Sequence, residues 1–287
     1  MFNKPKPLLH QNFSYSYSLP QKGFEKKVQF SYGSTSQNWG DLDIFAGGYI
    51  NFGYWHGIEL TKPVTLGERK LSSYNLYQHT LKILNPSLTD TIIEIGSGRG
   101  VGLIESFSCS SSNKLVGIDL TQAQIARAVA YAKASPVDTS CIQFIQSSAY
   151  SLPADPQSVD KIYSVEVLQH IQDFQALASE FKRVLKPGGN FAFVAHLATS
   201  EATNKSLKDY GLLISDIEVL AGIDTIKSAF EDEGFNVQCD SIGKEVFKGY
   251  EAWVNQLHPE DTDTNKIFDA YMGGYIDYFA CNFTAVI

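Results

Sequence analysis

The chain has 287 residues, of which 44% are hydrophobic and 19% are charged, and its formal net charge is −8. Such a composition is typical of a globular protein with a sizeable core, and the negative charge disfavours a long phosphate backbone as a partner. No apolar run approaches the roughly 18 residues that a membrane-spanning helix needs. The N-terminal segment, which we expect to be a loosely ordered arm, lacks the continuous apolar region of a signal peptide. We therefore expect a cytoplasmic protein.

Short apolar runs alternate with helix-like stretches from residue 91 onward. This alternation predicts an α/β fold whose parallel strands are joined by right-handed crossovers. Helices are expected at 122–135, 174–189 and 223–234, the second of them stopped by Lys-Pro-Gly-Gly. The expected strands are 91–96, 114–120, 142–148, 159–168, 189–197, 235–243 and 277–287.

Three regions fall outside this alternating pattern: the part up to residue 85, and insertions at 198–222 and 244–276. Insertions at strand ends on one side of an open sheet usually build the substrate pocket. We therefore divide the chain into an N-terminal arm with cap helices (1–85) and a core (86–287) whose insertions complete the cap.

The stretch "TIIEIGSGRGVG" (91–102) places glycine at every second position, from Gly96 to Gly102. Glycine permits positive φ and close backbone approach. Between a strand and a helix, it lets a ligand lie against main-chain N–H groups at the helix start. A tight turn with tight packing explains one or two such glycines, and seldom four in alternation.

The spacing and the nearby acids decide between ligands. A dinucleotide fingerprint requires G-x-G-x-x-G, and Val101 stands where its last glycine belongs. Glu94 is suited to a ligand that carries an ammonium group and unsuited to an anionic pyrophosphate. Asp119, at the end of the next strand, is placed to accept both hydroxyls of a ribose. Together these features describe an amino-acid nucleoside.

"EIGSGRG" resembles the first signature of class I S-adenosylmethionine-dependent methyltransferases. "GIDLTQAQIARA" (117–128) resembles the second, and the run from Ser147 to Val194 is similar to the third and fourth. The resemblance covers roughly residues 28–287. It implies a Rossmann-like sheet of seven mostly parallel strands, the last one antiparallel, with an aromatic-rich cap.

"YINFGYWHG" (49–57) resembles the segment that closes the cofactor site in methyltransferases of natural products, sterols and tocopherols, and an upstream tyrosine of that group corresponds to Tyr32. Two positions depart from the pattern: Ser148-Ala149 replaces the usual Asp-Ala, and Gly33 follows Tyr32 in place of an acid. The resemblance implies S-adenosylmethionine as cofactor, bound by Tyr32, Gly53, Tyr54, Glu94, Gly96, Gly98, Gly100, Asp119, Leu120, Gln124, Ser148, Ala149 and Glu166.

Methyl transfer to oxygen usually needs a base. His170 follows the fourth strand at the carboxyl edge of the sheet and is the first candidate, with a packing role as the alternative. Asp173 is placed to orient it or to cap the next helix. His196 ends the fifth strand and is the second candidate. Glu166 is expected near the methionine part of the cofactor, or hydrogen-bonded within its own loop.

The four cysteines, at 109, 141, 239 and 281, form no CxxC pair. Their spacing suits neither a zinc site nor a disulfide framework, so we expect buried or inert thiols. No His/Asp/Glu group has metal-ligand spacing, and we predict no metal. The "SCSSS" loop (108–112) lacks the G-x-S-x-G turn of serine hydrolases.

Aromatic residues concentrate before Tyr77 and after Phe247. They favour an acceptor with a large apolar or planar part, although they also suit cap packing or a homodimer surface. We predict methyl transfer to a small apolar acceptor, at oxygen with a histidine base. The alternatives are C-methylation of an isoprenoid or aromatic ring, with aromatic rings stabilising a cation, and cofactor binding without methyl transfer.

Overall fold

The computed structural model describes residues 22–33, 39–107, 109, 114–202, 210, 220–260 and 262–286. The expected N-terminal arm up to residue 21, most of the 108–112 loop and most of the 198–222 insertion lie outside these residues. The described helices are α1 (Lys22–Gly33), α2 (Leu66–Leu84), α3 (Val101–Ser106), α4 (Gln122–Ala134), α5 (Phe174–Val184), α7 (Ile223–Asp232), α8 (Gly243–Leu257) and α9 (Thr262–Met272), with 3-10 turns η1 (Trp39–Asp41) and η2 (Leu168–His170).

Seven strands form one sheet in the order β3-β2-β1-β4-β5-β7-β6. The first five are parallel, and β7 runs antiparallel to both of its neighbours. This confirms the expected Rossmann-like sheet with an antiparallel last strand. The strands are β1 (Thr91–Ile95), β2 (Lys114–Asp119), β3 (Ile142–Gln146), β4 (Val159–Val165), β5 (Leu185–Ala198), β6 (Phe235–Ser241) and β7 (Ile276–Ala285).

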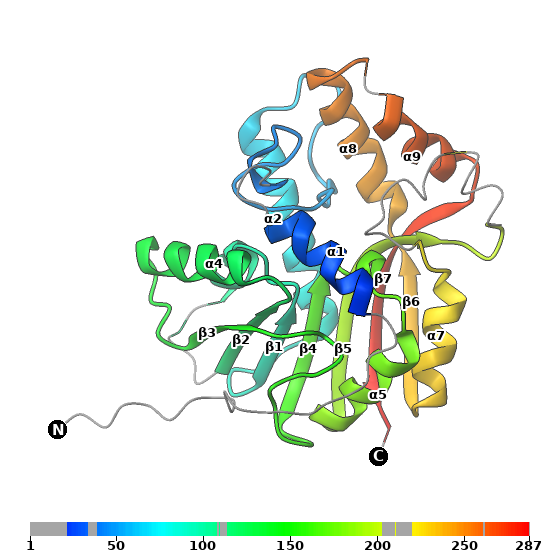
Figure 1. The fold of residues 1–287 in the computed structure, drawn as a ribbon. Helices are drawn as coiled ribbons and strands as arrows, with labels where there is room; N and C mark the ends of the chain where they lie inside the picture. Colours follow the sequence, from blue (N-terminus) through cyan, green and yellow to red (C-terminus); the bar gives the residue numbers. More distant parts are fainter. Residues whose placement is uncertain are drawn as a thin grey trace.

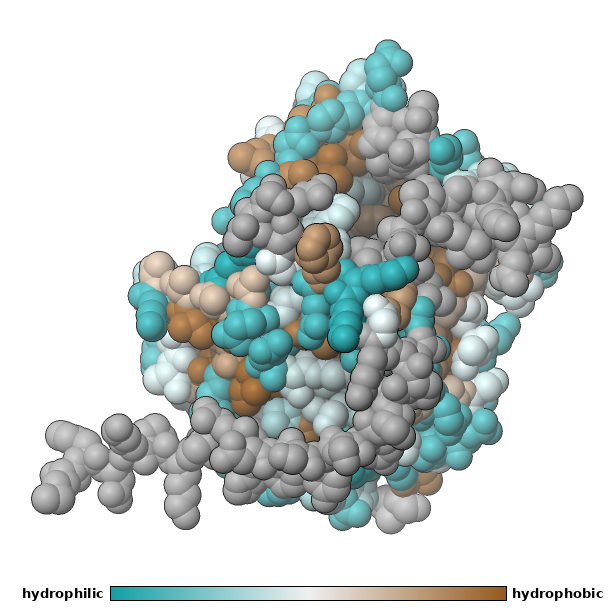
Figure 2. Space-filling model, viewed as in Figure 1, coloured by the Kyte–Doolittle hydropathy of each residue, from teal (hydrophilic) through white to brown (hydrophobic). Residues whose placement is uncertain are grey.

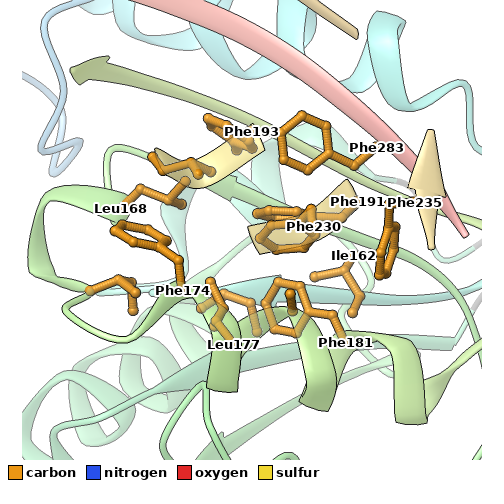
Figure 3. Close-up of a cluster of buried hydrophobic side chains, with 14 of the residues drawn as sticks. Ile162, Leu168, Phe174, Leu177, Phe181, Phe191, Phe193, Phe230, Phe235 and Phe283 are labelled. Atoms are coloured by element: carbon orange, nitrogen blue, oxygen red, sulfur yellow. The ribbon is translucent and has the colours of Figure 1, made fainter. Parts of the chain in front are cut away.

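Helices cover both faces of the sheet. On one face α5 and α7 enclose a core rich in phenylalanine, which Figure 3 shows between these helices and the central strands. Phe181 of α5 meets Phe191 of β5 edge-on with ring centroids 4.8 Å apart, and Phe230 of α7 lies 4.9 Å from Phe283 of β7. The other face carries α2, α3 and α4.

The cap, which we define as residues 39–65 with α8 and α9, lies beyond the carboxyl ends of the parallel strands (Figure 1). Its core is continuous with that of the α2 face, where Trp55 and Phe247 pack with Leu76. Helix α2 itself contacts β4, β5 and β7. The division between a cap unit (1–85) and a core (86–287) stays a prediction.

Side-chain caps begin α2 and α5, and the cap at Asp173 matches the sequence expectation. Thr65 begins α2 with a reciprocal capping box to Glu68, and Asp173 caps α5 through the backbone N–H of Ala176. The Lys-Pro-Gly-Gly segment was expected to close the α5 helix and lies instead at the start of β5. Leu185 already pairs with Val159 of β4, with a register shift before Lys161.

The prediction of four free thiols is wrong. Cys109 is bonded to Cys141, and Cys239 to Cys281. The second pair sits directly opposite on the antiparallel strands β6 and β7, with Cα atoms 4.1 Å apart. Cysteine spacing could not reveal this pairing, because it depends on which strands become neighbours in the sheet. The thiols therefore give no support to a reducing compartment.

Candidate functional site

The glycine turn between β1 and α3 serves two purposes. A side chain at Gly96, Gly100 or Gly102 would collide with Val167, Phe144 or Tyr77, respectively. These three glycines therefore allow neighbouring side chains to pack closely against the turn. Gly98 has a φ of 50° and faces open space, and it lines a cavity. Packing therefore accounts for more of the glycine run than the sequence suggested, and Gly98 is the position open to a ligand.

Asp119 fixes this turn from the end of β2. One carboxylate oxygen accepts the backbone N–H of Gly98 at 3.0 Å, and the other accepts the N–H and hydroxyl of Thr121, both at 2.8 Å. Burial raises the pKa of Asp119, although these hydrogen bonds oppose that shift. A carboxylate has about four acceptor sites, so Asp119 can bind a ligand hydroxyl while it holds the turn.

Helix α1 runs across the carboxyl ends of the central strands (Figure 1), and its residues Glu25, Val28 and Tyr32 line the cavity. Its inner side reaches the loops after three strands. Gln29 donates to the carbonyl of Leu120 at 3.2 Å, Glu25 accepts the Ser148 hydroxyl at 2.6 Å, and a 3.0 Å hydrogen bond joins the Tyr32 hydroxyl to Nε2 of His170. Figure 2 shows mainly hydrophilic side chains on its outer side.

The space between α1, the glycine turn and residues 48–50 is an open cavity. It extends from the loops after β2 and β3 to the loop after β4. Most of the predicted site residues line this cavity. They are Tyr32, Gly96, Gly98, Asp119, Leu120, Gln124, Ala149, Glu166 and His170.

Six predicted residues do not line this cavity: Gly53, Tyr54, Glu94, Gly100, Ser148 and His196. Gly53 packs against Ser72, and the Tyr54 ring stacks on His79 with centroids 4.5 Å apart. Gly100 packs against Phe144. Gly48, Tyr49 and Ile50, which precede Gly53 and Tyr54, line the cavity in their stead.

Glu94 points from β1 to the face of the sheet that α2 covers, and it is wholly buried near Tyr77 and Tyr163. Burial raises its pKa to about 8, more than the two nearby tyrosines lower it. The structure thus puts Tyr77, which lines the cavity, beside the carboxyl group that was expected to meet an ammonium group.

Glu166 lies at the end of β4 with φ of 54°, a conformation rarely adopted by residues other than glycine. One oxygen of its carboxylate accepts the backbone N–H of Phe52 and the hydroxyl of Tyr278, both at 2.6 Å. Arg69, which has 0% exposure, donates to the carbonyl of Asn51. The peptide group between Asn51 and Phe52 therefore connects a buried guanidinium to the carboxylate at the cavity.

His196 belongs to an aromatic stack behind Glu166. Its ring lies parallel to Phe52 with centroids 5.2 Å apart, and Phe52 stacks in turn on Tyr250 at 4.3 Å. Burial, helped by nearby His170, lowers the pKa of His196 to about 4, so its imidazole is neutral at physiological pH.

Several lining residues were missed by the sequence analysis: two lie within the glycine turn, and the others come from segments outside the glycine and acid motifs. They are Glu25, Val28, Gly48, Tyr49, Ile50, Tyr77, Ser97 and Arg99, among others. The Tyr77 ring occupies the space that Gly102 leaves empty, a contact that becomes visible only in the folded chain. No sequence signal marked α1, because its approach to the cavity depends on tertiary packing.

The donor set fits S-adenosylmethionine. Asp119 stands beside Gly98 for a ribose diol, and apolar side chains flank the cavity towards β3 for a planar base. Towards β4, Glu166 offers a carboxylate for a cationic group of the ligand. Within the described ranges, no group of three or more His, Cys, Asp and Glu side chains is arranged to hold a metal ion. No described helix is long and apolar enough to cross a membrane.

Comparisons with known proteins agree with this geometry. The family model described as "Methyltransferase domain" matches residues 93–193. The chain is 27% identical over 221 residues to an O-methyltransferase of Pyrenophora dematioidea, covering 75% of this chain and 79% of that protein. It is also 27% identical over 153 residues to the sterol 24-C-methyltransferase of Kluyveromyces lactis, covering 52% of this chain and 41% of that protein. The chain thus spans well under two thirds of the sterol enzyme's length.

Among solved structures, the chain is similar to geranyl diphosphate C-methyltransferase from Streptomyces coelicolor A3(2), in complex with Mg²⁺, geranyl diphosphate and S-adenosyl-L-homocysteine. The TM-score is 0.76 at 15% identity, with coverage of 93% of this chain and 99% of that one. At this identity the likeness shows the fold, which is that of the class I methyltransferases.

Proposed function

We propose that this class I S-adenosylmethionine-dependent methyltransferase transfers a methyl group to a small, largely apolar acceptor. The observation that carries the proposal is the cavity itself, which joins Gly98 and Asp119 at one end to Glu166 and His170 at the other. When bound, S-adenosylmethionine supplies a sulfonium methyl group. The protein's part is to position the acceptor in line and to exclude water.

Oxygen is the first proposed acceptor atom. His170 lines the cavity with its Nε2 hydrogen-bonded to the Tyr32 hydroxyl, within reach of a proton released by an acceptor hydroxyl. The O-methyltransferase of Pyrenophora dematioidea, of which this chain covers 79%, supports this choice. We assign Asp119 and Gly98 to the nucleoside and Glu166 to the reacting end of the cavity.

Carbon is the second proposed acceptor atom, and the surroundings of Glu166 favour it. Its carboxylate is held by Phe52 and Tyr278, whose rings belong to the aromatic cluster of the cap. A carboxylate among aromatic faces suits a cation that develops when carbon attacks the methyl group. The sterol and geranyl diphosphate enzymes named above are C-methyltransferases.

The test is transfer of radiolabel from methyl-labelled S-adenosylmethionine to extracted metabolites, followed by product identification. We expect wild type to label a low-polarity product and Asp119→Ala to label little of it. With an oxygen acceptor, His170→Ala should lower kcat far more than Glu166→Gln, and with a carbon acceptor the order should reverse. Cofactor binding without any labelled product would favour a cofactor-binding protein without methyl transfer. The proposals of a cytoplasmic location and a homodimer need separate measurements.

A further inference from the structure

Near the loop after β3, the cavity is lined by apolar side chains and by the carboxylates of Asp119 and Glu25. Val28 of α1, Leu120 after β2 and Ile171 after η2 contribute the apolar surface, and Glu25 lies beside Ser148 of that loop. An adenine ring has two apolar faces and an amino group that donates hydrogen bonds. Apolar lining residues together with a carboxylate acceptor match that base.

Glu25 and Ser148 divide the polar roles in this part of the cavity. The Ser148 hydroxyl oxygen accepts the backbone N–H of Tyr150 at 3.2 Å, and its proton is directed to Glu25 at 2.6 Å. Ser148, which the sequence analysis proposed as a cofactor contact, does not line the cavity, whereas Glu25 does. The hydroxyl therefore orients the carboxylate, and the carboxylate is the group presented to a ligand.

An ionised carboxylate accepts about four hydrogen bonds and donates none. After accepting from Ser148, Glu25 retains acceptor capacity towards the cavity. Hydrogen bonds to a charged acceptor are stronger than neutral ones. A donor on the ligand is thus favoured beside Glu25, and a ligand acceptor is repelled.

We propose that Glu25 of α1 accepts a hydrogen bond from the 6-amino group of the cofactor's adenine. This inference rests on the proposed function, since it presumes an adenosyl ligand in the cavity. It assigns recognition of the base to helix α1, and not to the loop after β3. Because Gln29 and Tyr32 fasten the same helix to the loops after β2 and β4, recognition of adenine and seating of α1 become one event.

The test compares two ligands by calorimetry on the full chain. One is S-adenosylhomocysteine, and the other is its analogue with hydrogen in place of the 6-amino group. Wild type should bind the amino form about 10 to 100 times more tightly, as expected for one hydrogen bond to a charged group. In Glu25→Leu the two affinities should agree within about twofold, with affinity for the analogue preserved.

A matched control keeps the test decisive. Glu231→Gln removes an exposed charge on the distant helix α7 and should keep the full preference.

Equal binding of both ligands by wild type would overturn the inference and leave the proposed function intact. Equal losses for both ligands in Glu25→Leu would also overturn it, because Glu25 would then only seat the helix. If wild type bound neither ligand, the proposed function would fail, and the inference with it.

Discussion

At the scale of single residues, the buried carboxyl of Glu94 is unusual in having no exposure at all. Its pKa is raised to about 8 from an ordinary value of 4.5, mainly by burial. Between these two values the folded state binds a proton that the unfolded state releases. The contribution of this carboxyl group to the free energy of unfolding is therefore fully present below its unfolded-state pKa and is lost as pH rises through its folded-state pKa.

We expect Glu94→Gln to flatten the pH dependence of stability between pH 6.5 and 8. In wild type this carboxyl lowers the free energy of unfolding with rising pH, by at most about 1.4 kcal/mol per pH unit. The window starts at 6.5 because His196, with its lowered pKa of about 4, changes stability in the opposite direction below it. Urea unfolding at several pH values measures the slope. Equal slopes in wild type and variant would contradict the assignment.

The contact between Tyr32 and His170 yields a second residue-scale prediction. Tyr32→Phe deletes the hydroxyl and should weaken S-adenosylhomocysteine binding about two- to tenfold, the range of one neutral hydrogen bond. His170→Ala should weaken it similarly, and the double variant should lose little more, because one contact is lost in each case. Calorimetry measures all three, with Tyr74→Phe on α2 as the matched control. Fully additive losses would show that the two side chains act separately.

Residue identity alone gave part of this site. Gly98 and Asp119 could be predicted because strand, turn and acid follow one another along the chain. Glu94 could not be placed, since one step along β1 decides which face of the sheet a side chain meets. Glu25 could not be found at all, because its proximity to Ser148 crosses 123 positions of sequence.

At the scale of elements, the strands and helices of the core followed the hydrophobic pattern closely. The main boundary error is β5, which begins at Leu185, before the two glycines expected to stop a helix. Pairing with β4 supplies the hydrogen bonds that carry the strand through this segment. The prediction of free thiols failed for a related reason, since the topology of the sheet decides which strands, and therefore which cysteines, become neighbours.

The disulfide between β6 and β7 gives an element-scale prediction. It closes a loop of 42 positions, for which chain entropy gives about 4 kcal/mol as an upper estimate. We expect Cys239→Ala with Cys281→Ala to lower the free energy of unfolding by about 2–4 kcal/mol in denaturant titrations. The double variant should then be less sensitive to reductant than wild type. Alkylation of all four cysteines in the native, unreduced protein would contradict the pairing.

Helix α2 holds the cap through Arg69, which donates to the carbonyls of Ile44 and Asn51 and lies over the ring of Tyr250. Arg69→Met leaves the Asn51 carbonyl without its donor, although the Ile44 carbonyl keeps the hydrogen bond from Trp253, and it removes a buried positive charge that interacts with Glu166. We expect a loss of roughly 3 kcal/mol in the free energy of unfolding and faster proteolysis within residues 44–57. Lys82→Met, exposed near the end of the same helix, is the control. Unchanged cleavage in Arg69→Met would contradict this role.

At the scale of the whole molecule, sheet and cap meet along the carboxyl ends of the parallel strands (Figure 1). The cavity takes its walls from both, so a ligand there touches α1, the segment before α2 and the strand loops at once. Occupancy should therefore stabilise the molecule as a unit. The sequence predicted this placement in outline, because insertions after parallel strands gather at one edge of the sheet.

A thermal shift measurement tests that coupling. A ligand present at 100 times its dissociation constant stabilises the folded state by about 2.7 kcal/mol, which should raise Tm by several degrees in a chain of this size. We expect S-adenosylhomocysteine to produce this shift and NADH to produce none, since Val101 interrupts the dinucleotide pattern. Asp119→Ala should reduce the shift, because the ribose hydroxyls lose their acceptor. A shift with NADH alone would mean that the cavity serves a dinucleotide, and the assignment of Asp119 to an adenosyl ribose would be lost with it.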